Sequence, residues 1–212
     1  MSSFVITRWK DYELLDSGKG RKLERFGKVT IIRPEIHANG PTKLSLDTWQ
    51  EMAAATFTES RSGKGTWINH RTLPKNWHVQ YKTSRGLVTF ALEQTKFKHV
   101  GLFPEQATNW EFIAKRLAHT PDASMLNLFA YTGAASVVAR SVGAEVTHVD
   151  SIRQVVSWSK KNMELSGLSD IRWIVEDALK FAHRAIKRGA KYDGLVMDPP
   201  TFGLGPKGER WK

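Results

Sequence analysis

The sequence predicts an α/β protein, with a doubly wound parallel sheet in the C-terminal part of the chain and a smaller β-rich N-terminal domain. Two observations carry this prediction. From about residue 101, short apolar runs alternate with segments of helical spacing, as in successive βαβ units. Before that point, turn signals rather than helices separate short strand-like runs. We therefore expect two domains, residues 1–100 and residues 101–212.

The N-terminal domain is expected to be mostly antiparallel β-structure. Strand-like runs occupy residues 29–35, 65–71, 77–83 and 87–94. In the last two runs the side chains alternate between two faces, as in half-buried strands. Between the strands, residues 44–57 are predicted to form one short helix, capped by Ser45 or Asp47.

The C-terminal domain is expected to begin with a helix over residues 104–119, which Thr108 or Asn109 can cap. Four strands are then predicted at residues 125–130, 145–150, 171–177 and 192–200, joined by helices at 133–143, 153–167 and 178–189. Such crossovers are right-handed, so the strands should form a parallel sheet with helices on both faces.

Positive charge is concentrated in one segment of the chain. The formal net charge is +11, and residues 61–100 hold eight Lys and Arg against a single Glu. Interleaved with these cations are Trp67, Trp77, Tyr81, Phe90 and Phe97. Cations neutralise phosphates and aromatic rings stack on bases, so the segment suits RNA docking. The alternative is a solvated basic face whose aromatic residues form a small β core.

The composition excludes several classes of protein and site. There is no cysteine, which removes disulfides, thiolate metal sites and a cysteine nucleophile. No window approaches the roughly 18 apolar residues of a membrane span, and the N-terminal residues lack the features of a secretory signal. We therefore expect a cytoplasmic protein that does not associate with membranes. The histidines lack the spacing of a metal site, so no metal is expected.

Polar or glycine residues follow each strand of the predicted parallel sheet, where ligands bind in such folds. Gly133 follows the first strand and lets backbone approach a ligand closely. Asp150 ends the second, where an acid commonly binds ribose hydroxyls. Glu176 and Asp177 end the third, and Asp198 ends the fourth. The alternatives are a tight turn at Gly133, a helix cap at Asp150 and the solvated start of a helix at Glu176 and Asp177.

The two prolines after Asp198 give the chain a stiff, extended path out of the sheet, because they fix φ and remove N–H donors. Backbone carbonyls there are available to a substrate amino group, and Phe202 is placed to stack on a planar ring. The segment therefore predicts a cleft for a flat, nitrogen-bearing heterocycle, such as an extruded base. The alternative is a rigid loop in which Asp198 caps a local turn.

Four segments, LNLFAYTGAAS, HVD, VED and MDPPTFG, resemble in this order the class I S-adenosylmethionine-dependent methyltransferases, whose fold is Rossmann-like. Residues 99–113 and 198–212 resemble more narrowly the bacterial ribosomal RNA methyltransferases related to the large-subunit cytosine-5 and guanine-N7 enzymes. This likeness starts near residue 10. The resemblance implies S-adenosylmethionine as the cofactor and RNA, in particular ribosomal RNA, as the substrate.

The resemblance also implies roles for single residues. Asp150 would bind the ribose hydroxyls, and Asp177 would lie at the adenine. Phe103 and Gln106 would cover the cofactor. The residues implied around its methionine part are Asn127, Phe129, Ala130, Tyr131, Thr132 and Gly133. Those implied at the methyl group and the substrate are Asp198, Pro199, Pro200 and Phe202.

The sequence departs from the family pattern in its first loop, where Asn127 stands in the acidic position and only Gly133 remains of the glycines. Cytosine-5 methylation ordinarily uses a cysteine, so a ring or exocyclic nitrogen is the expected target. One alternative is a catalytically silent RNA-binding module on the same scaffold. Another, a nicotinamide-dependent oxidoreductase, would need a Gly-x-Gly-x-x-Gly after the first strand, which is absent.

With the strand order 3-2-1-4 that goes with the resemblance, the fourth predicted strand lies at an open edge of the sheet. Class I methyltransferase sheets have more strands than the four predicted here, and this edge leaves Leu195, Val196 and Met197 without a neighbour. We therefore expect the chain to be a truncated form of a longer enzyme, or another chain to cover residues 194–198.

Overall fold

The computed structural model describes residues 9–59, 65–199, 203–204 and 210–211, and the chain folds as two compact units. The N-terminal unit contains Ile6–Tyr81 and Ala91–Pro104, and the C-terminal unit contains Lys82–Phe90 and Glu105–Lys212. The predicted division at residue 100 stays a proposal. The predicted α/β fold class is confirmed.

The N-terminal unit is built on a five-stranded sheet with the strand order β1-β2-β3-β4-β5. Its strands are β1 (Tyr12–Gly18), β2 (Arg21–Phe26), β3 (Val29–Pro34), β4 (Ala55–Glu59) and β5 (Gly65–Asn69). Neighbouring strands are antiparallel except β3 and β4, which are parallel. A parallel step needs a crossover connection, and helix α1 (Leu46–Met52) lies in it.

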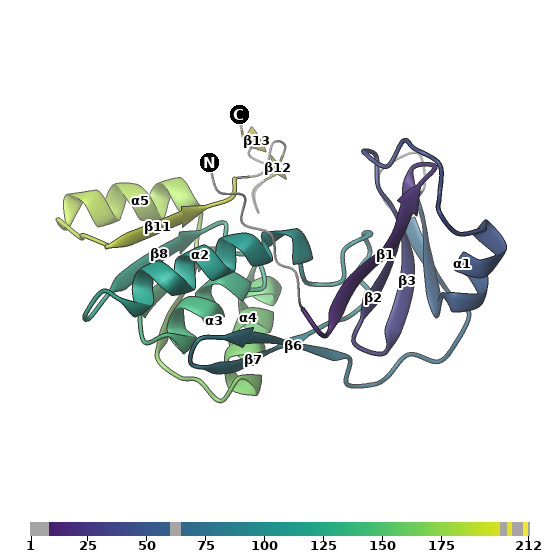
Figure 1. Ribbon diagram of the computed structural model, residues 1–212. Coiled ribbons are helices and arrows are strands. Elements are labelled where there is room, and N and C mark those ends of the chain that lie inside the picture. The colour runs from purple at the N-terminus through teal and green to yellow at the C-terminus, as the bar shows by residue number, and fades with distance from the viewer. Residues whose placement is uncertain (1–8, 60–64, 200–202, 205–209, 212) are drawn as a thin grey trace. The chain divides into compact units, whose positions relative to one another are not determined.

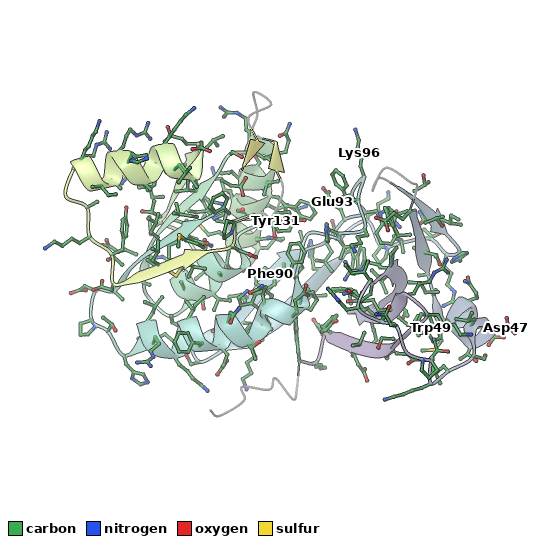
Figure 2. All side chains as sticks on the ribbon, turned by 90° about the horizontal axis from the view of Figure 1, so that it is seen from above. Asp47, Trp49, Phe90, Glu93, Lys96 and Tyr131 are labelled. Carbon is green, nitrogen blue, oxygen red and sulfur yellow. The ribbon has the colours of Figure 1, made fainter. Side chains whose placement is uncertain are left out.

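Helix α1 is shorter than the sequence predicts. Ser45 caps it, its hydroxyl accepting a hydrogen bond from the Thr48 N–H at 3.1 Å. The helix turns Trp49 inward, whereas Asp47 points outward and is not the cap (Figure 2). The prediction of helix through residue 57 is wrong, because β4 begins at Ala55. Pairing of β4 with β3 and β5 overrides the helix propensity of the alanines.

Two buried acids hold the N-terminal unit together. The carboxylate of Asp16 accepts hydrogen bonds from the backbone N–H of Leu44 at 2.8 Å and from the Trp49 indole at 3.0 Å. Burial alone would raise the pKa of Asp16, but these and further N–H donors hold it below its usual value. Glu24 binds Arg33 at 2.8 and 2.9 Å, and both side chains are buried.

The C-terminal unit is built on a four-stranded parallel sheet with the order β10-β9-β8-β11, so the predicted order 3-2-1-4 is confirmed. Its strands are β8 (Ser124–Leu128), β9 (Glu145–Asp150), β10 (Ile171–Val175) and β11 (Gly194–Met197). Its helices are α2 (Ala107–Ala118), α3 (Ala134–Ser141), α4 (Arg153–Leu165) and α5 (Ala178–Lys187). Two short strands, β12 (Gly203–Leu204) and β13 (Arg210–Trp211), pair separately.

The helices cover both faces of this sheet. Figure 1 shows α2, α3 and α4 on one face and α5 on the other. The connections through α3 and α4 step from β8 toward β10, whereas the connection through α5 returns to β11, and right-handed crossovers then place α5 on the opposite face. Under α5, Leu126, Leu128, Val149, Ala178 and Phe181 form a buried cluster. The strand order therefore reverses at β8, where ligands bind in open α/β sheets.

Helix α2 does not begin as predicted. The 3₁₀ turn Pro104–Gln106 precedes it, and Gln106 is its N-cap residue without a side-chain cap bond. Capping by Thr108 or Asn109 is wrong: both lie within the first turn, and the Thr108 hydroxyl donates to the Glu105 carbonyl at 3.2 Å. Pro104 starts the helical turn earlier because its φ is already helical.

Strands β6 (His78–Thr83) and β7 (Gly86–Ala91) form a separate two-stranded hairpin. Within the C-terminal unit, Phe90 packs against Trp110 of α2, with ring centroids 5.6 Å apart, and the Thr89 N–H donates to the Ser166 hydroxyl at 2.9 Å.

None of the helices in the described part of the chain is long and apolar enough to cross a membrane.

Candidate functional site

The register of the parallel strands brings their carboxyl ends to one edge. Leu128 pairs with Val149 of β9 and with Met197 of β11, and Asp150 pairs with Val175 of β10. The residues that follow these strands therefore share an edge, which includes both Asp150 and Asp198. This edge, hereafter the strand-end edge, is where the sequence predicts a ligand.

The loop after β8, residues 129–133, contains three left-handed residues. Phe129 has a φ of 54°, Tyr131 of 49° and Gly133 of 79°. For a residue with a β-carbon this conformation costs about 1–2 kcal/mol, so surrounding contacts must hold the loop. The Ala130 N–H donates to the Val149 carbonyl at 3.1 Å, which fixes the loop to the next strand. Tyr131 is labelled in Figure 2.

Gly133 is required by close packing as well as by its φ. It is the N-cap residue of α3, as predicted, and is buried. A β-carbon on Gly133 would lie 2.9 Å from Ser159 Cβ and 3.3 Å from His148 Cε1. The backbone therefore approaches α4 and β9 more closely than any side chain would allow.

Asp150 ties the loop after β8 to the loop after β9. Its Oδ2 accepts from the Tyr131 N–H at 2.9 Å and its Oδ1 from the Ile152 N–H at 3.0 Å. Burial raises the pKa of Asp150, and the backbone N–H groups of Ile152, Tyr131 and Ser151 oppose that rise only in part. Ile152, and not Asp150, is the N-cap residue of α4, so the alternative that Asp150 caps this helix is wrong. Each carboxylate oxygen has a further lone pair for a hydroxyl donor.

Three of the predicted loop residues have buried side chains. Asn127, Ala130 and Thr132 are 3%, 8% and 1% exposed. The Asn127 amide donates to the Ser136 hydroxyl at 2.9 Å, below the loop and within the core. These positions therefore offer backbone rather than side chains to a ligand, and their contact with a cofactor stays a prediction.

The structure adds four polar residues that sequence reasoning missed. Ser136, His148, Ser159 and Asn162 are all fully buried beneath the loop. The only signal in the sequence is a polar residue at an apolar position of the strand or helix pattern, such as His148 inside EVTHVD.

The acids at the end of β10 bind groups of the protein itself, whereas the acid after β11 is exposed to solvent. Asp177 is the N-cap residue of α5, its carboxylate accepting from the Lys180 N–H at 2.9 Å, and its contact with adenine stays a prediction. Glu176 binds Arg184. Asp198 and Pro199 are exposed, whereas Pro200 and Phe202 lie outside the described residues.

Within the described ranges, no three His, Asp or Glu side chains gather closely enough to hold a metal ion.

Phe103 and Gln106, which the resemblance places over the cofactor, precede α2. The half-buried ring of Phe103 lies 4.9 Å from that of His99, within the N-terminal unit. Burial lowers the pKa of His99 to about 4, with the cations Arg33, Lys98 and Lys22 adding to the effect. The Gln106 amide oxygen accepts from Asn109 at 2.6 Å, within the C-terminal unit. Contact of either residue with a cofactor stays a prediction.

Most aromatic residues of the basic segment are core residues. Trp77, Tyr81 and Phe90 are 5%, 5% and 0% exposed, so the prediction that they stack on bases is wrong and the β-core alternative is confirmed. Alternation buries them because each faces inward from its strand or strand end. Trp67 is half-buried and donates to the Thr95 carbonyl at 2.9 Å, whereas Phe97 is 51% exposed.

Comparison with known proteins shows similarity along most of the chain. Residues 106–203 match the family described as "Conserved hypothetical protein 95". The chain is 31% identical over 194 residues to ribosomal RNA large subunit methyltransferase K of Neisseria meningitidis, covering 85% of this chain and 51% of that protein. It is 35% identical over 116 residues to ribosomal RNA large subunit methyltransferase K/L of Pseudoalteromonas translucida, covering 53% of this chain and 16% of that protein.

A solved structure extends the similarity to the fold. The chain aligns with the S-adenosylmethionine-dependent methyltransferase of Agrobacterium tumefaciens with a TM-score of 0.87 and 42% identity, covering 95% of this chain and 64% of that one. The chain therefore spans about half of the Neisseria relative and less than two thirds of the Agrobacterium protein.

Proposed function

We propose that this chain, which belongs to the class I S-adenosylmethionine-dependent methyltransferases, binds S-adenosylmethionine at the strand-end edge and transfers its methyl group to a base of ribosomal RNA. The observation that carries the proposal is the bond from the Tyr131 N–H to Asp150, which joins a left-handed loop to a partly buried carboxylate at the reversal point of the sheet. The names of the relatives support the reaction class and the RNA substrate.

The residues at the strand-end edge fit this cofactor. Asp150 offers acceptors to the two ribose hydroxyls, and the backbone of the loop that it holds, residues 129–133, is proposed to contact the methionine part. When bound, the cofactor supplies an activated methyl group on a sulfonium. The remaining task of the chain is to hold the nucleophile of the base in line with that methyl group, which is catalysis by positioning.

We assign the base-binding role to the segment after β11. The exposed carboxylate of Asp198 is suited to accept a hydrogen bond from a base amino or ring N–H, and Pro199 stiffens the backbone beside it. Pro200 and Phe202 are proposed to continue this surface from their place in the sequence. Because the chain has no cysteine, the proposed target is a ring or exocyclic nitrogen rather than C5 of a pyrimidine.

The basic segment is proposed to dock the RNA backbone through its cations. The exposed cations of this segment in the described residues are Arg71, Lys75, Lys82, Arg85 and Lys96. Phosphate contacts of this kind position RNA without reading its sequence.

Asp198→Asn is expected to lower the rate of methyl transfer to unmodified ribosomal RNA by roughly tenfold to hundredfold, because it removes the charge that orients the target nitrogen. Tritium transfer from labelled S-adenosylmethionine measures the rate, and mass spectrometry of the nucleosides identifies the methylated atom. Asp170→Asn, an exposed change before β10, is the matched control and should leave the rate unchanged. Equal rates in the two variants would remove Asp198 from the mechanism.

Asp150→Asn is expected to weaken S-adenosylmethionine binding roughly tenfold, because an amide cannot accept hydrogen bonds at both atoms. The pKa of Asp150 is raised by burial, so the ionised acceptor is lost at a higher pH than for a solvent-exposed aspartate. Wild-type affinity should therefore begin to fall at a higher pH on acidification, and Asp150→Asn should lack that transition. Calorimetry across a pH series measures both effects, and a pH-independent wild-type affinity would contradict the assignment.

The same measurements distinguish the proposed function from its main alternative. A catalytically silent RNA-binding module would bind ribosomal RNA through its basic segment but give no heat with S-adenosylmethionine at any pH. That result, obtained with a folded chain, would replace the proposed function.

A further inference from the structure

Beneath the loop after β8 lies a row of buried polar side chains. Their polar groups gain nothing from the hydrophobic effect. Asn127 of β8, Ser136 of α3, His148 of β9 and Ser159 of α4 are each at most 3% exposed. A buried polar group costs about 1–3 kcal/mol when it lacks a partner, so such residues persist only when each is satisfied. In the described part of the chain no buried side-chain nitrogen or oxygen lacks a partner, so this row is fully satisfied.

The hydrogen bonds of this row run in one direction. The Asn127 amide donates to Ser136 Oγ at 2.9 Å, and Ser136 Oγ lies 3.0 Å from His148 Nδ1. On the other side of the ring, Nε2 lies 3.3 Å from Ser159 Oγ. Because the one proton of the Ser159 hydroxyl goes to a backbone carbonyl, its oxygen can only accept from the ring, which places the ring proton on Nε2 and lets the Ser136 hydroxyl donate to Nδ1. Burial lowers the pKa of His148 to about 3, so the ring stays neutral.

The row ends on the backbone of the loop. The Ser159 hydroxyl donates to the Tyr131 carbonyl at 2.7 Å, with the Val155 carbonyl as a second neighbour at 3.0 Å. One turn further along α4, the Asn162 amide donates to the Thr132 carbonyl at 2.9 Å. Two successive carbonyls of the loop are thus held from the core side.

Holding these carbonyls determines where the loop N–H groups point. The C=O and N–H of a trans peptide point in opposite directions, so a Tyr131 carbonyl turned into the core turns the Thr132 N–H toward the outer side of the loop. The same contact stabilises Tyr131 at its left-handed φ of 49°. The loop conformation therefore depends on a donor that sits in the core.

We propose that His148, Ser136 and Ser159 are positioning residues for the cofactor loop, acting through the Tyr131 carbonyl rather than by touching the ligand. The inference rests on the proposed function and deepens it, since it identifies what sets the shape of the cofactor site. It assigns the buried histidine a single tautomer, protonated on Nε2, because only that tautomer continues the row to Ser159.

The test compares two serines of the same helix. Both Ser157 and Ser159 donate to the carbonyl four residues earlier in α4, but only Ser159 also reaches the Tyr131 carbonyl. In calorimetry with S-adenosylhomocysteine, Ser159→Ala should raise the Kd roughly tenfold while Ser157→Ala changes it less than about twofold. Equal affinities of the two folded variants would overturn the proposal.

Nuclear magnetic resonance gives a readout that a general loss of stability would not move. Long-range ¹H–¹⁵N correlations of wild-type His148 should show a protonated Nε2 and an unprotonated Nδ1 at both about pH 5 and about pH 8. In Ser159→Ala the backbone amide signals of Tyr131, Thr132 and Gly133 should shift, and in Ser157→Ala they should not. A protonated Nδ1, or unmoved loop signals in Ser159→Ala, would overturn the proposal.

These spectra need no cofactor, so they separate the inference from the function it rests on. If the wild-type chain gives no heat with S-adenosylmethionine or S-adenosylhomocysteine, the proposed cofactor site fails, and the spectra alone then decide whether the row shapes the loop. If Ser159→Ala does not fold, Ser136→Ala takes its place, and the wild-type tautomer still decides the direction of the row.

Discussion

Gly133→Ala is expected to lower the free energy of unfolding by about 2–4 kcal/mol and to weaken S-adenosylmethionine binding at least roughly tenfold. At a φ of 79° a β-carbon is strained, and here it would also lie 2.9 Å from Ser159 Cβ in the core. The loop must therefore shift away from α4, which carries the backbone of the proposed cofactor site with it. Urea unfolding measures the first effect and calorimetry the second.

Gly167→Ala is the matched control for this prediction. Gly167 has a φ of 66°, and no atom lies within 4 Å of the position that its β-carbon would take. It should therefore show only the conformational cost of about 1–2 kcal/mol and leave cofactor affinity unchanged. If both variants lost the same stability and both kept wild-type affinity, close packing of Gly133 would have no role in the site.

Arg33→Met is expected to lower the free energy of unfolding of the N-terminal unit by about 3–5 kcal/mol. It leaves the Glu24 carboxylate, which is 0% exposed, without the guanidinium that binds both of its oxygens. It also removes the bond from Arg33 to the Lys98 carbonyl at 3.1 Å. Urea unfolding followed by tryptophan fluorescence measures the change, since Trp49 and Trp77 belong to the same unit.

A double variant, Glu24→Leu with Arg33→Met, separates the charge from the packing. Replacing a buried ion pair with apolar residues of similar volume is often close to neutral, so the double variant should recover most of the lost stability. A double variant as unstable as Arg33→Met would show that lost packing, and not the loss of the guanidinium from the buried carboxylate, causes the effect.

The parallel sheet is predictable because the rules for connecting parallel strands allow few ways to arrange its strands and helices. Short strand-like runs alternate with segments of helical spacing in the C-terminal unit, and the handedness of βαβ crossovers then determines which face each helix covers. The strand-end edge follows from this parallel arrangement, so the locations of Asp150, Gly133 and Asp198 at that edge could be predicted without coordinates.

The fold of the N-terminal unit is less predictable, because it depends on buried charged side chains whose partners are distant in the sequence. Strands β1 and β2 carry charged residues that would ordinarily mark a solvated segment, yet Asp16 and Glu24 are buried. Their partners lie elsewhere in the chain, Glu24 binding Arg33 and Asp16 binding the Trp49 indole. The polar row beneath the loop escapes prediction for the same reason, since Ser136 and Ser159 meet His148 only when α3 and α4 pack on β9.

The hairpin of β6 and β7 has a practical consequence for dissecting the molecule. Residues Lys82–Phe90 belong with the C-terminal unit, while the chain on either side of them belongs with the N-terminal unit. No single peptide-bond cleavage can separate the two units cleanly, because any cut leaves a piece of one unit on the fragment that holds the other. A gene fragment of the C-terminal unit alone would need an engineered linker in place of residues 91–104, which belong to the N-terminal unit.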